Sequence, residues 1–263
     1  MDRHDGPQVT QRWHSIRCYL LLCLILAPAA AATEPTRNLL WVTLQTCILT
    51  KRMTGRALPC LAVDLGDKDR PGTAVLRAPG QATHVVVMPT ERVVGLEDPQ
   101  LQQRPGTAYW QAALAARHYV TEALGGRLTA YDVGLAVNSI GGRSQDQLHI
   151  HLDCVQPSVQ AALQHYASTI GSTWAAMPIA LQGSRFFALR VGADQMRDLN
   201  PFAALGHLPG RRTELRDTSL AMISVSGESG TRDFVLLAYR DPEAHAEKLL
   251  DHACTALAKA AAK

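Results

Sequence analysis

Residues 147–154 alternate strictly between polar and apolar side chains. Successive side chains of a β-strand point to opposite faces, so the pattern predicts a strand, at 147–155, with one polar and one apolar face. The polar row is Gln147, His149, His151 and Asp153, and the apolar row is Leu148, Ile150, Leu152 and Cys154. We expect the apolar row to enter the core. A polar row backed in this way is either a solvent-exposed face or a functional site.

The two histidines of the polar row lie two residues apart, so their rings are close together on one face. A neutral imidazole is a good nucleophile toward phosphorus near neutral pH. A second imidazole beside it can donate to a leaving group or hold a phosphate oxygen. The spacing also suits a metal held by His149, His151 and Asp153. We expect the other histidines to be structural or surface residues: His4, His14, His84, His118, His165, His207, His245 and His252.

A second polar group, at 89–97, follows a predicted strand at 84–88. It places Arg92 near the turn at Gly95. A guanidinium group matches the geometry of phosphate oxygens. Because an exposed arginine is usually solvated surface, the importance of Arg92 depends on whether it meets the histidine strand.

Strands and helices interleave along the chain, with at least one hairpin, which is typical of an α+β fold. We expect one domain over 36–263, with a C-terminal part that extends it. The strands are predicted at 61–63, 73–77, 84–88, 132–138, 147–155, 186–191, 220–225 and 234–239. The helices are predicted at 38–54, 107–124, 157–174, 193–205 and 243–262.

Composition excludes several classes of protein. With 263 residues, 47% hydrophobic and 19% charged, the chain is globular rather than disordered or fibrous. A net charge of +3 is too small to indicate a nucleic-acid partner. No apolar run reaches the ~18 residues of a membrane span, which excludes a multi-span membrane protein.

Residues 1–32 have the pattern of a targeting segment. Arg12 and Arg17 precede an apolar run at 18–32, which ends in small residues with a possible cleavage site after Ala32. This order is typical of a secretory signal peptide. The alternative is an uncleaved N-terminal membrane anchor. In both cases the rest of the chain enters an oxidising compartment.

Four cysteines remain beyond this segment: Cys47, Cys60, Cys154 and Cys254. Disulfides form and persist in an oxidising compartment. Four cysteines allow three pairings. Our hypothesis pairs Cys47 with Cys60 around a short loop that contains Gly and Pro, and Cys154 with Cys254, which would join the middle of the chain to its end.

The segment GGRSQDQLHIHLD resembles the signature of the histidine-triad superfamily of nucleotide hydrolases and transferases. Ser144 takes the place of the signature serine, and Gln147, His149 and His151 take the three triad positions. Gln147 departs from the usual histidine, and Arg92 stands where the superfamily often has histidine. These departures, with MPTERVVGLEDP, NSIGGRSQDQLHIHLDC and DHAC, resemble the CDP-diacylglycerol pyrophosphatase family over roughly 36–257.

The resemblance implies a histidine-triad-like α+β fold, with an antiparallel sheet, packed helices and a C-terminal α+β extension. It implies hydrolysis of CDP-diacylglycerol to CMP and phosphatidate. His149 would attack the phosphorus that carries CMP and form a nucleotidyl-histidine intermediate, which water then hydrolyses. His151 would bind phosphate oxygens, and Gln147 would donate to the α-phosphate.

By the same resemblance, Ser144 and the backbone of Gly141 and Gly142 would contact the pyrophosphate, and Arg92 would neutralise the leaving phosphate. Asn138 matches an asparagine that ends a strand in the superfamily. No metal, cofactor or obligate protein partner is implied. Membrane surface is expected as a partner, with the helix at 107–124 or the C-terminal part facing the lipid. The location implied is the bacterial cell envelope, at the inner membrane with the catalytic domain on the periplasmic side.

Two other functions compete with this one. A histidine-triad enzyme could act on soluble nucleotides, although such substrates are chiefly cytosolic and the N-terminus indicates the envelope. A non-catalytic envelope module could bind metal through His149, His151 and Asp153.

Overall fold

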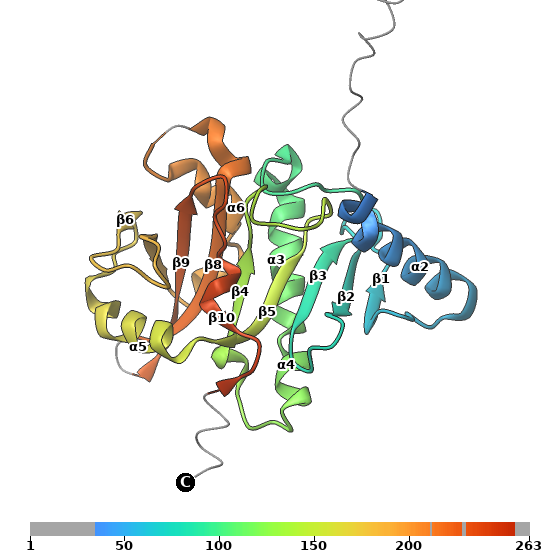
Figure 1. Cartoon of the computed structure of the whole chain (residues 1–263), viewed down its shortest axis with the longest axis horizontal. Helices are drawn as coiled ribbons and strands as arrows, with labels where there is room; N and C mark the ends of the chain where they lie inside the picture. Colours follow the sequence, from blue (N-terminus) through green and yellow to red (C-terminus); the bar gives the residue numbers. More distant parts are fainter. Residues whose placement is uncertain (1–34, 211, 228–229, 256–263) are drawn as a thin grey trace, which may run out of the picture. The chain divides into compact units, whose positions relative to one another are not determined.

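One antiparallel β-sheet runs through the described part of the chain (Figure 1). The computed structural model describes residues 35–210, 212–227 and 230–255. Within these ranges the sheet has ten strands, of which nine follow the order β1-β2-β3-β5-β4-β8-β9-β7-β6 and the tenth, β10, pairs with β5. All the pairings between strands are antiparallel. The α+β class with a large antiparallel sheet is therefore confirmed.

The sheet has two halves that join between β4 and β8. The first half contains β1 (Ala62–Asp64), β2 (Thr73–Arg77), β3 (Val85–Pro89), β5 (Ile150–Val155) and β4 (Val133–Val137). The second half contains β8 (Thr218–Ser226), β9 (Arg232–Arg240), β7 (Phe187–Val191) and β6 (Ala175–Ala176), while β10 (Leu250–Asp251) borders β5. Leu135 pairs with Met222 at the junction. The C-terminal strands thus extend the first sheet, and the predicted β8–β9 hairpin forms its longest pairing.

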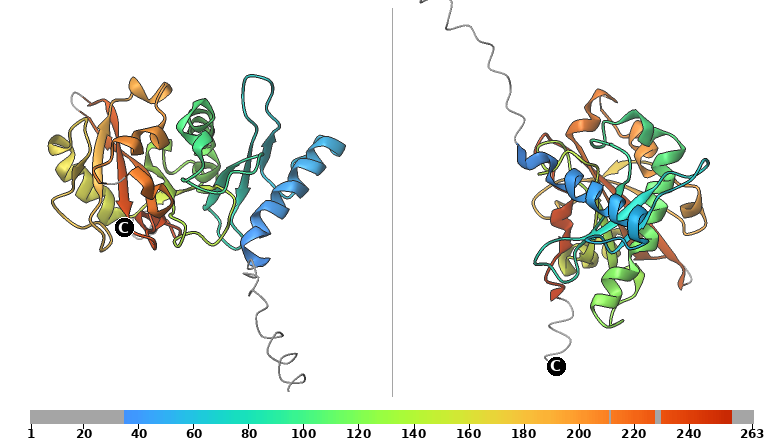
Figure 2. Two further views of the ribbon diagram at one scale, coloured as in Figure 1. Left: turned by 90° about the horizontal axis from the view of Figure 1, so that it is seen from above. Right: turned by 90° about the vertical axis from the view of Figure 1, so that its right-hand side faces the viewer.

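Helices cover both faces of this sheet. α3 (Arg104–Ala116), α4 (His118–Ala123) and α6 (Pro201–Ala204) share one apolar core with one face. On the other face, α2 (Leu39–Thr54) packs against β1–β3, and α5 (Pro157–Tyr166) packs near β8 and β9 (Figure 2). The 3-10 turns are Pro35–Asn38, Pro99–Gln102, Ala130–Asp132, Ala167–Thr169, Gln195–Arg197, Leu205–His207, Arg212–Asp217 and Glu247–Leu249.

β5 begins at Ile150, three residues later than predicted, and its register separates the polar and apolar side chains as the alternation predicts. His151 pairs with Val86 of β3 and with Ala136 of β4, and paired residues share a face. Val86 belongs to the core under α2, and Ala136 to the core under α5. The whole apolar row enters the core of the opposite face. The polar row therefore emerges between two apolar clusters.

The helix predicted at 107–124 is two helices. α3 begins earlier, at Arg104, and the chain breaks at Arg117 before α4 begins at His118. The Arg117 guanidinium donates to the carbonyl of Leu114 and His118 Nδ1 to that of Ala115. These side chains occupy acceptors that the helix backbone would otherwise use.

The helix predicted at 243–262 is absent from the described residues up to 255. In its place lie a 3-10 turn at Glu247–Leu249 and β10. Leu250 pairs with Val155, and the Asp251 carboxylate accepts from the amides of Ala253 and Thr255. Strand pairing and local capping override the helical preference of an alanine-rich segment.

Two further helices are shorter than predicted. α5 ends at Tyr166, and a 3-10 turn follows it. Residues 193–205 form short turns around Pro201, where Asn200 caps α6 by accepting from Phe202 and Ala203. Proline favours a helix start and lacks the N–H that a longer helix would need there.

Both predicted disulfides are confirmed. Cys47 of α2 is bonded to Cys60, and Cys154 of β5 to Cys254. The first joins α2 to the segment before β1, and the second links residues separated by 100 positions. Among the described residues, none of the helices is both long and apolar enough to cross a bilayer. The predicted targeting segment at 1–32 lies outside those residues.

Replacing Cys47 and Cys60 together by alanine should lower the free energy of unfolding by about 3 kcal/mol, because the disulfide closes a short loop in the unfolded chain. The measurement is denaturant unfolding without reductant, with the wild-type chain as reference. An unchanged unfolding midpoint would contradict this prediction.

Candidate active site

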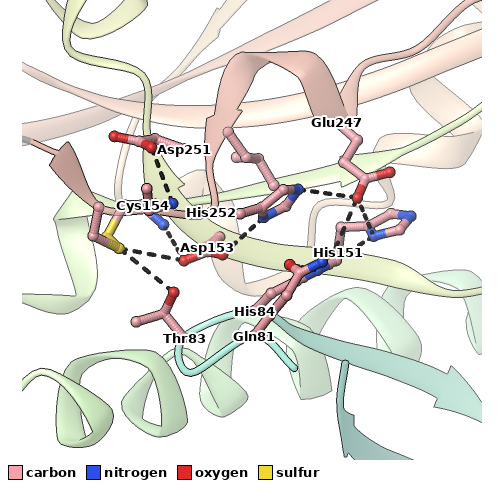
Figure 3. Close-up of polar contacts among 12 residues, drawn as sticks. Gln81, Thr83, His84, His151, Asp153, Cys154, Glu247, Asp251 and His252 are labelled. Carbon is pink, nitrogen blue, oxygen red and sulfur yellow. Dashed lines mark hydrogen bonds and ion pairs between the residues drawn. A yellow bond between two sulfur atoms is a disulfide. The ribbon is translucent and has the colours of Figure 1, made fainter. Parts of the chain in front are cut away.

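The polar face of β5 lies under the segment 244–252. Ser139 donates its amide to the carbonyl of Ala244, and β10 pairs with β5, so this segment is held across the face. Figure 3 shows His84, His151, Glu247 and His252 gathered around the strand, with Asp153 beside them. The cluster brings together side chains from β5, from the turn before β3 and from the C-terminal segment.

His149 is held as a neutral imidazole with one free nitrogen. Its Nδ1 lies 2.6 Å from the carbonyl oxygen of Gln147. A carbonyl only accepts, so Nδ1 carries the proton and Nε2 keeps its lone pair. Burial lowers the pKa of His149, which keeps the ring neutral at neutral pH. No described residue is hydrogen-bonded to Nε2.

A chain of hydrogen bonds sets the tautomers of two further histidines. His84 Nδ1 donates to Gln81 Oε1 at 2.7 Å, so His84 Nε2 accepts from His151 Nδ1 at 2.9 Å. His151 Nε2 is then a lone pair, buried without a partner in the described structure. Burial lowers the pKa of His84 and holds that of His151 well below its ordinary value. The rings of His149 and His151 meet edge to face at 4.7 Å between centroids.

His252 is the positively charged member of the cluster. Its Nδ1 lies 2.8 Å from Asp153 Oδ2, and its Nε2 lies 3.1 Å from Glu247 Oε1. Both partners are acceptors, so both ring nitrogens carry protons. The hydrogen bond to Asp153, followed by that to Glu247, raises the pKa of His252 to about 9. This imidazolium stacks on His84 at 4.1 Å between centroids.

Glu247 connects His252 to His151. Burial, the largest single effect, would raise the pKa of Glu247, but the hydrogen bond from the His252 imidazolium, the nearby His151 ring and the hydrogen bond from Asn138 together lower it below its usual range. Oε1 lies 3.2 Å from His151 Nδ1. Asn138 holds the other side, since its Nδ2 donates to Oε2 at 2.9 Å and its Oδ1 accepts the Glu247 amide at 3.1 Å.

A profile of the CDP-diacylglycerol pyrophosphatase family matches residues 35–258. The chain belongs to the CDP-diacylglycerol pyrophosphatase family. A relative from Yersinia pestis with that name is 32% identical over 253 residues, covering 92% of this chain and 95% of the relative. Relatives with the same name from Mycobacterium bovis and Mycobacterium tuberculosis are 33% identical over 227 residues, 84% of each chain.

Two family motif residues expected to bind phosphate have protein partners in the structure. Gln147 is buried, and its Nε2 donates to the carbonyls of Pro89 at 3.0 Å and Glu91 at 2.9 Å. Both of its N–H groups are therefore used, and the amide ties the histidine strand to the turn after β3. Asn138 likewise forms two hydrogen bonds with Glu247. In the described structure both side chains thus hold neighbouring parts of the protein together.

The glycines of the GGRS loop pack closely against the C-terminal segment. A Cβ at Gly141 would lie 2.5 Å from the carbonyl oxygen of Pro242, and one at Gly142 2.4 Å from that of Ala244. Their amides already donate, Gly141 to Pro242 and Gly142 to Ser139 Oγ. Close packing thus requires glycine here. Ser144, two residues on, is exposed.

The two arginines near the site have different surroundings. Arg92 is exposed, donates to Asn38 Oδ1 at 2.7 Å and lies over the ring of Trp41, so it contacts the start of α2 and none of the site histidines. Arg143 is buried and donates to both oxygens of Glu97, at 2.6 and 3.0 Å. It lines a small depression that includes His149.

Two of the histidines expected to be structural or surface residues, His84 and His252, belong to this cluster. His84 stacks on His151, and His252 stacks on His84, and only long-range packing places them there. The DHAC motif contains His252, so its resemblance to the family could have identified this histidine as a candidate site residue. The expectation holds for His118, His165, His207 and His245, which are exposed, while His4 and His14 lie outside the described residues.

Two groups of three side chains that contain histidine lie close enough to hold a metal ion. One is His84, His151 and Glu247, and the other is His84, Asp153 and His252, with all ligand atoms within 4.8 Å of one another. His149, His151 and Asp153, the set predicted from strand spacing, do not form such a group. A cation would have to displace the protons on His151 Nδ1 or on His252.

The pKa of His252 predicts a pH dependence of stability. The folded pKa of about 9 exceeds the ordinary value of 6.5. The contribution of His252 is therefore complete below pH 6.5 and is lost as the pH rises through about 9. We expect His252→Gln to flatten the fall in unfolding free energy over this window, measured by denaturant unfolding. His165→Gln, at an exposed histidine, is the control, and an equal slope in both variants would contradict the assignment.

Proposed function

We propose that this chain hydrolyses the pyrophosphate bond of CDP-diacylglycerol, releasing CMP and phosphatidate through a nucleotidyl-histidine intermediate on His149. The relatives carry the name of this activity. The observation that carries the mechanism is the tautomer of His149, whose Nδ1 donates to the Gln147 carbonyl while Nε2 keeps a free lone pair. A neutral imidazole held this way is a competent nucleophile toward phosphorus.

In the first step His149 Nε2 attacks the phosphorus that bears the cytidylyl group, and the bond to the bridging oxygen breaks. Phosphatidate leaves with that electron pair. Positive charge then spreads over the modified ring to the Nδ1–H, and its hydrogen bond to the Gln147 carbonyl becomes charge-assisted. In the second step water attacks the same phosphorus, and the bond from phosphorus to His149 Nε2 breaks. CMP is released, and His149 returns to a neutral ring.

His151 is the proton carrier in this proposal. Its Nε2 is a buried lone pair without a described partner, and its ring touches that of His149. A pyrophosphate anion nearby favours protonation of this nitrogen. Protonated, His151 donates to the departing phosphate oxygen; neutral, it takes the proton of the attacking water. Glu247, 3.2 Å from Nδ1, balances the charge in the protonated form.

Ser144 and Arg92 remain proposed substrate contacts. Both are exposed and lie on segments joined to the histidine strand, Ser144 on the loop before it and Arg92 after the turn that Gln147 holds. The likeness to histidine-triad enzymes is also part of the proposal. It rests on the His-x-His pair at the start of an antiparallel strand, with His149 just before β5 and His151 within it, and on the glycine loop before the pair.

We further propose that the catalytic domain lies on the periplasmic side of the inner membrane. Two disulfides support an oxidising compartment. The substrate carries two acyl chains, so the enzyme must work at a bilayer surface. The apolar run at 18–32 has the pattern of a signal peptide, and an uncleaved anchor is the alternative.

The central test is His149→Ala. We expect CMP release from CDP-diacylglycerol to fall by about 10³-fold or more, because no nucleophile remains. Acid quenching of the wild type with cytidine-labelled substrate should leave label on His149. His165→Ala is the matched control. Full activity of His149→Ala, or turnover restricted to soluble nucleotides, would refute the proposal.

Glu247→Gln tests the proton carrier. We expect kcat to fall by about 10²-fold and the acidic limb of the pH profile to move to lower pH, because a protonated His151 loses its counter-charge. Glu243→Gln, an exposed carboxylate on the same segment, should leave both unchanged. A loss of activity with an unmoved pH profile would count against this role.

A further inference from the structure

Large exposed apolar side chains are concentrated on one segment of the chain. Among the described residues, all of them except Tyr131 lie between positions 39 and 65. They are Leu39, Val42, Leu49, Met53, Leu58, Leu61 and Leu65. Scattered exposed apolar residues need no explanation, but a concentration of this kind marks an interaction site.

Four of them form a stripe on α2, the outer stripe. At ~100° per residue, Leu39, Val42, Leu49 and Met53 fall within an arc of about 80°. They are exposed by 64, 58, 56 and 75%. The buried residues of α2, Leu44, Cys47 and Ile48, lie on the opposite side. α2 is therefore apolar on two sides, of which the protein covers one.

Three threonines in or beside the outer stripe have hydroxyls with hydrogen-bond partners inside the helix. The hydroxyls of Thr43, Thr46 and Thr50 donate to the carbonyls four residues earlier, at 3.0, 3.2 and 2.8 Å. A hydroxyl with an internal partner loses little when it leaves water. These three threonines can therefore enter an apolar medium at low cost.

The charged residues near the outer stripe indicate which apolar medium it contacts. Residues 35–63 contain no acidic side chain, while Lys51, Arg52 and Arg56 lie at the end of α2 and just beyond it. A helix with an apolar stripe and flanking basic residues is the kind that lies in the interface of an anionic bilayer. A second copy of this chain offers no matching acidic partner for these cations within the same stretch.

α2 follows the apolar N-terminal run in the sequence, and its start contacts the loop before the histidine site. The apolar run at 18–32 ends shortly before the helix. Arg37, just before α2, pairs with Asp146 at 2.8 Å, and the Leu40 amide donates to Gln145 Oε1 at 2.7 Å. The start of α2 is thus bound to the loop that leads to His149.

We propose that the outer stripe of α2 lies in the headgroup region of an anionic lipid bilayer and presents the histidine site to that surface. The choice of a lipid-linked pyrophosphate as the molecule presented rests on the proposed function. The contact with the bilayer does not. This differs from the expectation that 107–124 or the C-terminal part faces the lipid, since α3 and α4 cover the core of the other face.

A photocrosslink tests the contact in the full chain. p-Benzoylphenylalanine replaces Met53, or the exposed His165 of α5 as the matched control, and the protein is irradiated with vesicles of phosphatidylglycerol and phosphatidylcholine. We expect a lipid adduct at 53 and none at 165. A crosslink to residues 1–34, a crosslink to a second copy, or no lipid adduct at 53 would overturn the proposal. Because the crosslink reports on the surroundings of position 53, the test is valid whether or not residues 1–34 also bind the bilayer.

Kinetics supply the second readout. For Leu49→Gln combined with Met53→Gln we expect the apparent KM for CDP-diacylglycerol in vesicles to rise by about tenfold, because two apolar side chains leave the interface. The kcat/KM for a short-chain, water-soluble CDP-diacylglycerol should not change. Equal losses on both substrates, or no loss on vesicles, would overturn the inference. If the wild type releases CMP from neither substrate, the proposed function fails, and the crosslink alone decides the membrane contact.

Discussion

The antiparallel pairing of β5 between β3 and β4 is the constraint on which the rest of the structure depends. It sets His151 opposite Val86 and Ala136, so the polar row emerges between two apolar clusters while the apolar row fills the opposite core. A slip of one residue would exchange the two rows and bury imidazoles under α3. The position of the site is therefore a consequence of strand register, and the packing that fixes the register also fixes the site.

Burial of this polar row has a cost that the C-terminal segment offsets. Asp153 is fully buried and would be unpaired without His252, and Glu247 balances the same imidazolium from its other side. The Cys154–Cys254 disulfide joins the residue after Asp153 to the residue two beyond His252. A covalent bond thus holds together the two segments that supply the ion pair. Burial keeps the other three imidazoles of the site, those of His84, His149 and His151, neutral, as the proposed attack on phosphorus requires.

Local patterns predicted much of this protein. Strict alternation located the strand and separated its faces, and cysteine order with compartment led to both disulfides. The two helix predictions that were wrong share a cause, which is that interactions other than helix propensity decide the structure. Residues 243–255 contain alanines that favour a helix, but pairing with Val155 and capping by Asp251 decide their structure. The helix at 107–124 breaks at Arg117 because side chains compete for its carbonyls.

The sequence by itself determined that His149 and His151 share a strand face behind a glycine loop, because period-two geometry is a local property of the backbone. Only the tertiary structure decided which atoms are free to react. The tautomers of His149 and His84 depend on the nearby residues Gln147 and Gln81. The protonation of His252, however, depends on Asp153, 99 positions away, and that of His151 on His84, 67 positions away. Hydrogen bonds between distant segments form only after the sheet has assembled, and they leave no local pattern in the sequence.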